Sequence, residues 1–303
     1  MSTPSPAPDT NEPDELRVRA WRLLLAAATA ARRGTSLVHA DSSWLGFGAN
    51  GCVASPTAPT GARVLLDLYG PLCGAGPERP LALAQLGQSL DGHIATASGD
   101  SYFVTGPDSL RHLHRLRALC GAVVVGAGTV ARDDPRLTVR HVEGDSPVRV
   151  ILDPNARLDA AHRVFADARV PTIVVHAADV RAPAPGHAQV LRVPVEQRRL
   201  RLDVLLRELN ARGLWSVLVE GGGATVSSFL EAGLLDRLQI AIAPLITGDG
   251  RPGLSLAARD KIAECLRPAH RVFALGGDVL FDCDLRAAAL PAVVGKGAVA
   301  RVI

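Results

Sequence analysis

Two glycine-rich turns are the first candidates for chemistry in this chain. Gly126-Ala127-Gly128-Thr129 follows an apolar run at residues 122–125, and Gly221-Gly222-Gly223 follows another at 215–219 and precedes a predicted helix. Glycine lets the backbone approach a ligand closely, and the free N–H groups at a helix N-terminus favour a phosphate. Either turn taken alone is explained as well by a tight turn that needs a positive φ. Neither turn by itself establishes a phosphate site.

Charged side chains stand beside these turns. The carboxylates of Asp133, Asp134 and Glu220 suit hydrogen bonds from ribose hydroxyls or acid–base work, although Asp134 precedes a proline and is typical of a turn. Arg117 and Arg140 carry planar guanidinium groups that can hold a phosphate through two parallel hydrogen bonds. For each arginine singly, a solvated surface position is the ordinary alternative.

A dinucleotide fingerprint is present but incomplete. Residues 126–131 match G-x-G-x-x-A, and Asp153 lies where a ribose-binding acid would be expected. The helix that should follow is interrupted by Asp133-Asp134-Pro135, because proline disfavours helix in the residue before it. We therefore exclude a Rossmann dehydrogenase.

The remaining reactive residue types predict no metal site. His112 and His114 stand two apart on a predicted helix and do not share a face, and the chain has no H-E-x-x-H or Cys/His cluster. The five cysteines have no C-x-x-C pair, which predicts buried free thiols in a reducing compartment.

The composition of the chain limits the kinds of partner that it can bind. The net charge of +3, without any basic run, argues against nucleic-acid binding. The acidic, proline-rich first residues are the reverse of a signal peptide, and the longest apolar run, residues 23–31, is too short to span a bilayer. We expect a cytoplasmic protein that binds neither nucleic acid nor membrane.

Two regions precede the main pattern. Residues 1–13 read as a disordered tail, and residues 14–78 as a small extension of unknown role. The extension begins with a predicted helix at 15–33 and contains strand-like pieces at 44–47 and 63–68. A linker at 73–80 sets a boundary near residue 78.

Residues 79–286 alternate between strands and helices, as in an α/β domain. A helix opens after Thr105 as a predicted N-cap, with Leu110, Leu113, Leu116 and then Cys120 on its apolar stripe. Leu238, Ile240 and Ile242 alternate as in a half-buried strand. Further strands are predicted at 81–86, 122–125, 148–152, 171–176 and 215–219, helices at 202–213 and 224–232, and a hairpin at 271–283. The tail 287–303 has no assigned structure.

Several of these segments together resemble a known family. SLDGHIATASGDSYFVTGP (89–107), GAGTVARDDPRLTVR (126–140) and VEGGGATVSSFLEAGLLDRLQIAIAPLITGDGRP (219–252) look like the C-terminal reductase domain of the bacterial bifunctional riboflavin-biosynthesis deaminase/reductase. The resemblance covers about residues 79–285. It implies a dihydrofolate-reductase-like α/β fold, with a central mixed sheet and helices on both faces, usually as a homodimer.

The resemblance also implies a reaction and its ligands. NADPH would reduce C1′ of the ring-opened ribose of 5-amino-6-(5-phosphoribosylamino)uracil, a phosphorylated pyrimidine, and the product would carry a ribitylamino group. Matching positions assign Ser101, Arg117, Leu137, Arg140 and Glu220 to the substrate. No position is clearly the proton donor, and Glu220 and water are both candidates. Matching cofactor positions are Gly87, Phe103, Thr129, Asp133, Pro154, Gly222, Gly223, Ala224, Thr225, Val226, Ser227 and Ser228.

Three departures from the family pattern bear on the substrate. The family often has lysine or arginine where His93 stands, lysine at Gln85 and tryptophan at Phe103. If the family lysines bind the substrate or donate a proton, their replacement would slow the reaction or change the preferred substrate.

The deaminase half of the family protein has no counterpart here. Its H-x-E and P-C-x-x-C motifs are matched only in part, by His39-Ala40-Asp41 and Pro71-Leu72-Cys73-Gly74. The glutamate is replaced by the shorter Asp41 and the second cysteine is missing, so we expect neither zinc nor deaminase activity. Two other functions stay open: an NADPH-dependent reductase of another heterocycle such as a pterin, and a non-catalytic nucleotide-binding paralogue.

Overall fold

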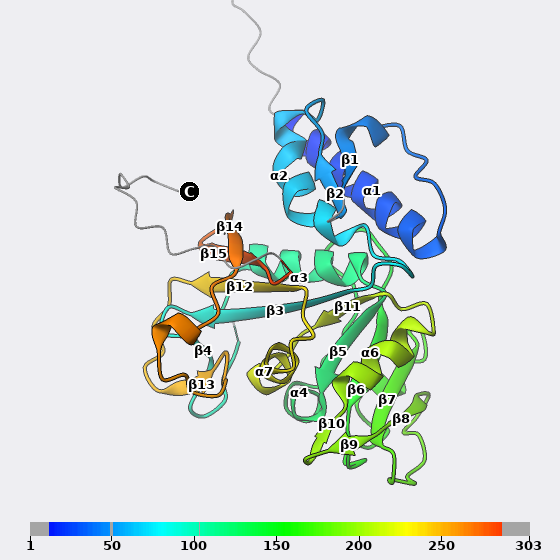
Figure 1. Ribbon diagram of the computed structural model, residues 1–303, viewed down its shortest axis with the longest axis vertical. Helices are drawn as coiled ribbons and strands as arrows, with labels where there is room; N and C mark the ends of the chain where they lie inside the picture. The colour runs from blue at the N-terminus through cyan, green and yellow to red at the C-terminus, as the bar shows by residue number, and fades with distance from the viewer. Residues whose placement is uncertain (1–11, 49–50, 103, 287–303) are drawn as a thin grey trace, which may run out of the picture. The chain divides into compact units, whose positions relative to one another are not determined.

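The computed structural model describes residues 12–48, 51–102 and 104–286 (Figure 1). The chain divides into two compact units, residues 1–79 and residues 80–303. Phe103, one of the predicted cofactor residues, lies outside the described residues, as do residues 1–11 of the predicted disordered tail 1–13 and the predicted tail 287–303. The prediction is wrong for residues 12 and 13, which begin a helix.

The first unit is built on two packed helices, α1 (Glu12–Arg33) and α2 (Thr60–Tyr69), with a small hairpin of β1 (Leu45–Gly48) and β2 (Gly51–Ala54). The helix predicted from residue 15 is confirmed, and Leu23 and Leu24 on its stripe are fully buried. The strand predicted at 63–68 is wrong, because this segment is part of α2. Its buried Leu65, Leu68 and Tyr69 follow the i, i+3, i+4 spacing of a helix face.

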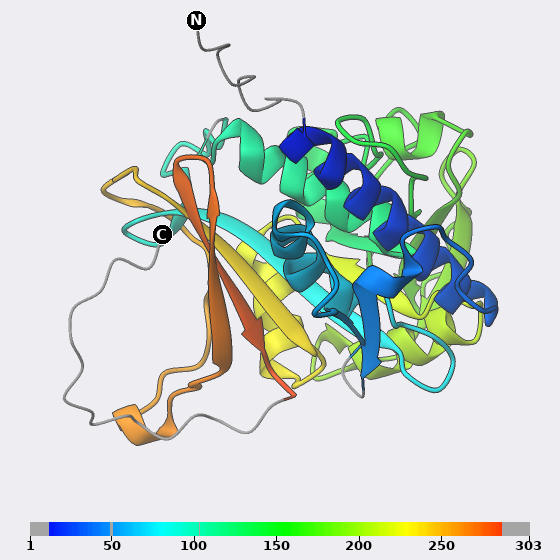
Figure 2. The ribbon, with the colours of Figure 1, turned by 90° about the horizontal axis from the view of Figure 1, so that it is seen from above.

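The second unit contains a nine-stranded sheet. Along the sheet the strands run in the order β14 (Ala269–Leu275), β15 (Asp278–Asp284), β12 (Arg237–Ala243), β3 (Leu81–Ser89), β11 (Ser216–Val219), β5 (Ala122–Gly126), β6 (Val148–Leu152), β7 (Thr172–Ala177) and β8 (Gln189–Val193). The strands from β12 to β8 are parallel, whereas β15 is antiparallel to β12 and to β14. The antiparallel pair forms one edge of the sheet (Figure 2). The expected mixed sheet is confirmed.

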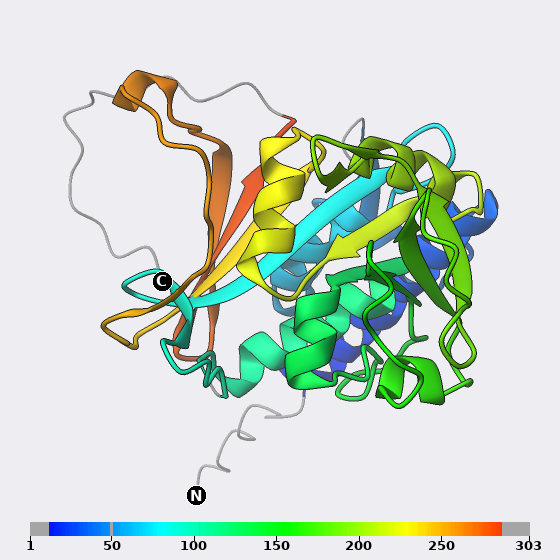
Figure 3. The same ribbon diagram turned by 90° about the horizontal axis from the view of Figure 1, so that it is seen from below.

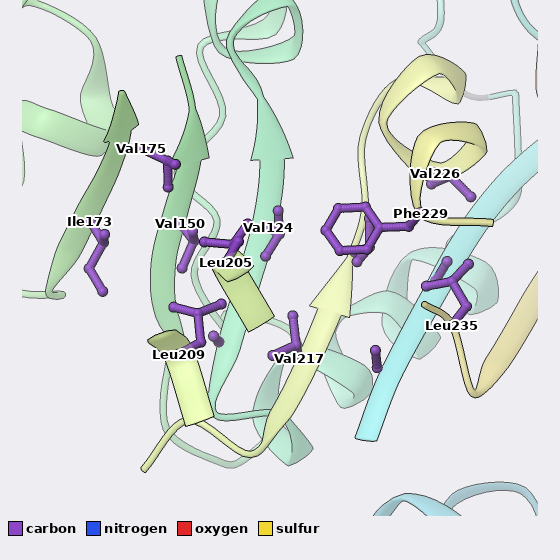
Figure 4. Close-up of a cluster of buried hydrophobic side chains, with 14 of the residues drawn as sticks. Val124, Val150, Ile173, Val175, Leu205, Leu209, Val217, Val226, Phe229 and Leu235 are labelled. Atoms are coloured by element: carbon purple, nitrogen blue, oxygen red, sulfur yellow. The ribbon is translucent and has the colours of Figure 1, made fainter. Parts of the chain in front are cut away.

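Helices cover both faces of this sheet, as expected. On one face, α6 (Leu202–Asn210) and α7 (Gly223–Glu231) bury Leu205, Leu209, Val226 and Phe229 against alternate residues of the central strands, such as Val124 (Figure 4). The helix α3 (Pro107–Leu119) covers the opposite face (Figure 1). Parallel strands buried on both faces explain the continuous apolar runs in the sequence.

Some predicted details of these elements are wrong. The N-cap of α3 is Gly106 rather than Thr105, and Leu110 on the predicted stripe is 41% exposed. The strand β12 is not half-buried, since its polar Gln239 is fully buried while Ile240 and Ile242 are only partly covered. A strand inside a sheet has both faces covered, and alternation in its own sequence cannot reveal this.

Two further expectations are corrected. A helix does follow the first glycine turn: α4 (Ala127–Asp133) is 7 residues long, and its C-cap is Asp134, whose φ of 38° is left-handed. The interruption before Pro135 thus shortens the helix without preventing it. Cys265 is exposed, whereas the other four cysteines are buried free thiols as predicted.

The topology gathers the candidate residues at one edge. The carboxyl ends of parallel strands lie at the same edge of a sheet, where ligands of open α/β folds bind. Since β11 is inserted between β3 and β5, the segment after β11 lies between the segments that follow β3 and β5. Two small antiparallel pairs add to the unit, β4 (His93–Thr96) with β13 (Gly250–Pro252) and β9 (Val195–Glu196) with β10 (Arg199–Leu200). A four-residue helix, α5 (Arg163–Ala166), precedes β7.

Within the described residues, no helix has the length and apolar character needed to cross a membrane.

Candidate active site

The two glycine-rich turns pack against each other. The backbone N–H of Gly222 donates a hydrogen bond of 3.0 Å to Thr129 Oγ1. A Cβ built on Gly221 would lie 2.9 Å from the same oxygen, and one built on Gly126 would lie 2.7 Å from Thr225 Oγ1. Gly221 also has a left-handed φ of 97°. Glycine is therefore required at these positions by the contact between the turns as well as by the turn geometry.

Within the described residues, the N-terminus of α7 has no side-chain cap. Its N-cap is Gly222, and no side chain caps the first-turn N–H groups. These groups carry the positive end of the helix dipole and accept a phosphate readily. Figure 3 shows this helix lying against β3. Residues at the start of α7 line two cavities, which we call the first and the second cavity.

The first cavity has a volume of about 280 Å³. Eight of the predicted site residues line it: Gly87, Ser101, Arg117, Thr129, Asp133, Leu137, Glu220 and Gly222. Gly87 comes from β3 itself and Arg117 from α3, and the others come from the segments that follow the short strand at residues 93–96, β5 and β11. The structure therefore brings together most of the predicted substrate residues with several of the predicted cofactor residues.

A buried ion pair forms one wall of the first cavity. Arg117 donates from Nε to Glu220 Oε1 at 3.0 Å and from Nη2 to Oε2 at 3.1 Å. Its Nη1 donates to the carbonyl oxygen of Thr138 at 3.2 Å. Arg117 is 7% exposed and Glu220 4%. Both carboxylate oxygens of Glu220 thus act as acceptors here, and Arg117 ties the end of β11 to the segment that carries Leu137 and Arg140.

The segment after α4 has a strained backbone at the cavity. Leu137 is buried and has a φ of 53°, a conformation that a bulky residue rarely adopts. Strain of this kind persists only where the surroundings enforce it, and it is concentrated at functional sites. Asp134 has the left-handed φ of 38° expected in a turn, but its side chain does not bond the backbone of that turn, because Oδ1 accepts the N–H of Arg163, 29 residues further along the chain, at 2.8 Å.

Arg140 does not line the first cavity. Its Nη1 donates to Thr138 Oγ1 at 2.9 Å, and its backbone N–H donates to His114 Nδ1 at 3.0 Å. His114 is fully buried, and burial together with the nearby positive charge of Arg117 lowers its pKa to about 3. The neutral ring can therefore accept this hydrogen bond and fix the backbone at Arg140, a role that the sequence did not suggest.

The second cavity, of about 720 Å³, is lined by residues of the first turns of α7. Predicted cofactor residues in its lining are Pro154, Ala224, Thr225 and Ser228. The β9–β10 hairpin completes it with Arg198 and Arg199, next to Arg201.

Three predicted cofactor residues point elsewhere. Val226 is fully buried in the core beneath α7, and Ser227 is buried with its Oγ accepting the N–H of Ser255 at 2.8 Å. A Cβ on Gly223 would lie 2.4 Å from the carbonyl oxygen of Gly253, so protein fills the space beside it. These residues can serve a ligand only through their backbone or through the position of the helix.

Sequence reasoning missed five arginines. Arg132 and Arg251 line the first cavity, and Arg198, Arg199 and Arg201 line the second. Asp133 and Arg132 are exposed at the end of α4. The only available signal was the position of Arg132 beside Asp133, since Arg198 and Arg251 reach the site through pairings distant in sequence.

Gln85 and His93, two of the residues that differ from the family pattern, have different surroundings. Gln85 is 7% exposed and lines the first cavity. His93 does not line it, and its Nδ1 lies 3.1 Å from Thr247 Oγ1 and 3.4 Å from Asp91. His93 therefore holds two loops together, and only Gln85 stands at the cavity.

The two segments that partly match the zinc motifs, residues 39–41 and 71–74, make contacts within the first unit. Asp41 is buried and accepts hydrogen bonds from the guanidinium of Arg19, and its backbone N–H donates to His39 Nδ1. Cys73 Sγ donates to the carbonyl oxygen of Tyr69 at 3.3 Å. Across the described ranges, no group of three or more His, Cys, Asp or Glu residues is arranged to hold a metal ion.

Comparison with known proteins gives a consistent set of relatives. The model of the RibD C-terminal domain matches residues 80–267. A 2,5-diamino-6-ribosylamino-4(3H)-pyrimidinone 5′-phosphate reductase of Methanothermobacter thermautotrophicus is 36% identical over 218 residues, which are 69% of this chain and 99% of that protein. The riboflavin biosynthesis protein RibD of Escherichia coli is 33% identical over 61% of this chain and 54% of its own length.

A solved structure agrees. The deaminase/5-amino-6-(5-phosphoribosylamino)uracil reductase of Thermotoga maritima superposes with a TM-score of 0.59 at 32% identity, over 68% of this chain and 57% of that chain. The chain thus spans about half of the bifunctional relatives but nearly the whole of the archaeal reductase. The match over residues 80–267 shows that the chain belongs to the RibD C-terminal domain family.

Proposed function

We propose that the chain is an NADPH-dependent reductase that converts the ribosylamino group of 5-amino-6-(5-phosphoribosylamino)uracil to ribitylamino, as a step of riboflavin biosynthesis. The observation that carries the proposal is the pair of cavities lined by residues at the start of α7, in a chain of this family. Its relatives are named as reductases of phosphorylated ribosylaminopyrimidines.

The residues present fit a dinucleotide. The uncapped first turn of α7 offers N–H groups to its phosphates, and the apolar and hydroxyl side chains of Pro154, Thr225 and Ser228 suit its adenosine half. Thr129 and Asp133, next to the same turn, would hold the other half at the first cavity. The chemistry that bound NADPH supplies is a hydride for C1′ of the substrate.

The residues of the first cavity would position the substrate. Arg117 and Glu220 are fixed by their mutual hydrogen bonds, so their polar edges need no rearrangement when a ligand binds. Val125 and Leu137 are buried and exclude water from the same wall. Arg251 and Arg132 add positive charge that favours a phosphorylated substrate.

A second candidate is the same reduction on the pyrimidine that still carries its 2-amino group. The observation that favours it is the 36% identity to the archaeal reductase over 99% of that protein, whose name specifies the diamino substrate. Both candidates use the same site and differ in one exocyclic group of the ring.

One experiment tests the proposal and separates the candidates. The purified chain is mixed with NADPH and either the uracil or the diamino substrate, and the product is analysed by mass spectrometry for a gain of two hydrogens. We expect reduction of one substrate at least tenfold faster than the other, in the range by which a hydrogen-bonding site rejects the wrong group. Absence of reduction with both substrates, in a protein that binds NADPH, would contradict the proposal and favour a non-catalytic paralogue.

The oligomeric state belongs to the same proposal. We expect a homodimer, supported by the exposed edge strand β14 and by exposed Leu256, Ile262 and Leu266 in the segment before it. Light scattering during gel filtration should give twice the mass of 31.7 kDa.

A further inference from the structure

We infer that the β9–β10 hairpin selects NADPH over NADH, with the Arg198 guanidinium binding the 2′-phosphate of the adenosine ribose. This inference rests on the proposed function, because it concerns the cofactor of the same site. It goes further by assigning a specificity to a segment outside the residues matched to the family's cofactor contacts.

The second cavity has the size and lining for an adenosine. Its volume of about 720 Å³ lies within the usual range of small-ligand sites, roughly 300–1,000 Å³. Leu152, Pro154 and Phe229 form apolar parts of the wall, while Thr225 and Ser228 bring hydroxyl groups from α7. A dinucleotide whose phosphates bind at the start of α7 would reach this cavity with its adenosine half.

The hairpin that borders the cavity has a costly turn. Glu196 pairs with Arg199, and the two residues between them, Gln197 and Arg198, have φ values of 48° and 65°. Turns with two left-handed residues normally use Asn-Gly. A glutamine and an arginine are strained there, so the turn is less stable than a glycine-containing sequence would make it. The strain is accounted for if the arginine side chain at this position has a function.

Charge pairing singles out Arg198 among the arginines of the cavity. Arg199 pairs with Glu231 at 3.0 Å, and Arg201 pairs with Glu196 and Asp203, each at 2.9 Å. These contacts neutralise both arginines. Arg198 makes no ion pair with any residue that the structure describes. Among the described residues, it is the uncompensated cation in the lining of the second cavity.

A 2′-phosphate is the group that distinguishes the two nicotinamide cofactors, and an arginine is its usual partner. A planar guanidinium holds a phosphate dianion through two hydrogen bonds at once. NADH presents a neutral hydroxyl at the same place and gains little from Arg198. The expected consequence is a preference for NADPH that depends on this side chain.

Binding of adenosine fragments tests the inference without catalysis. Isothermal titration is carried out with adenosine 2′,5′-bisphosphate and with adenosine 5′-monophosphate, on the full chain and on the variants Arg198→Gly, Arg198→Lys and Arg181→Ala. Arg181 is an exposed arginine outside both cavities and serves as the matched control.

Arg198→Gly should weaken binding of the bisphosphate by about tenfold to a hundredfold, the loss expected for a charge-assisted hydrogen bond. Binding of the monophosphate should stay unchanged, and Arg198→Lys should restore part of the lost affinity. Because glycine relieves the turn strain, the Tm of Arg198→Gly should be equal to or above that of the parent chain. A structural role would instead lower the Tm and weaken both fragments equally.

The inference is overturned if the parent chain does not prefer the bisphosphate, or if Arg198→Gly retains the preference. Failure of the proposed function has a different signature, since turnover would be absent while the fragment preference and its dependence on Arg198 persist.

Discussion

The two cavities beside α7 differ in how their charges are held. In the first cavity the central arginine and glutamate are buried and paired through two hydrogen bonds, whereas in the second the charged groups stand on an exposed hairpin. The first is smaller, about 280 Å³ against about 720 Å³. The first cavity is thus a rigid, preorganised pocket, as hydride transfer would require, and the second is a more open one, as cofactor binding would require.

The largest effect is expected from breaking the buried pair. Arg117→Met or Glu220→Leu leaves one buried charge without its partner and should lower the free energy of unfolding by about 3–5 kcal/mol. The double variant Arg117→Met/Glu220→Leu should recover most of this loss, yet remain inactive if the pair serves the reaction. Urea unfolding and NADPH oxidation measure the two effects.

The control is an exposed pair. Arg212 and Glu208 are joined at 2.6 Å on the surface of the helix α6 region, and Arg212→Ala should cost below about 1 kcal/mol. Two results would contradict this prediction. Glu220→Leu could lower the free energy of unfolding no more than Arg212→Ala does, or the double variant could keep full activity.

Acidic pH should lower the free energy of unfolding, because two histidines are buried. Burial lowers the pKa of His112 to about 4 and that of His114 to about 3, from an ordinary value of 6.5. The unfolded chain therefore binds protons at a higher pH than the folded chain. Stability is present above pH 6.5 and is lost as the pH falls from there toward 4 and 3, by at most about 1.4 kcal/mol for each unit of pKa difference.

Chemical denaturation across this pH range measures the effect. His112→Gln should flatten the dependence, while His187→Gln, at an exposed position, should follow the parent chain. Equal pH dependence of all three chains would contradict the assignment.

A negative charge introduced at the start of α7 should change the stability of the protein and its affinity for the cofactor in opposite directions. Ala224 is an exposed residue of the first turn and lines the second cavity. Ala224→Asp should raise stability by about 0.3–1 kcal/mol through the helix dipole. The same carboxylate should repel the cofactor phosphates and weaken NADPH binding by about tenfold. Ala224→Ser is the neutral control, and undiminished NADPH binding by Ala224→Asp would place the phosphates elsewhere.

The smallest effect is expected at Arg140. Its guanidinium is exposed and does not line the first cavity, so Arg140→Ala should change stability by no more than about 0.5 kcal/mol. It should raise the substrate KM less than Arg251→Ala, whose side chain does line that cavity. Steady-state kinetics of the two variants decide the order, and the reverse order would require a larger substrate pocket than the one described.

Local patterns predicted much of the fold and of the candidate site. The strand at 148–152 was predicted with its observed bounds, and the two glycine turns follow strands as expected. Arg117 and Glu220 were both singled out, although their direct pairing was not, because they are 103 residues apart in sequence. Pairing between distant segments is set by sheet order, which no local pattern contains.

The missed features share this cause. The helix at Thr60–Tyr69 was taken for a strand because a short apolar run does not distinguish a strand from a buried helix. Arg198 could not be recognised from the sequence, since only the β9–β10 hairpin brings it to the same cavity as Pro154 and Ser228.

The most direct test of the central claim is a coupled measurement of cofactor oxidation and substrate reduction. NADPH absorbance and product mass are followed together with each of the two pyrimidine phosphates, for the parent chain and for Arg181→Ala as a control. We predict that one equivalent of NADPH is oxidised for each ribitylamino product, with both chains alike. Saturable NADPH binding without oxidation by either pyrimidine would contradict the claim that these cavities form a reductase site.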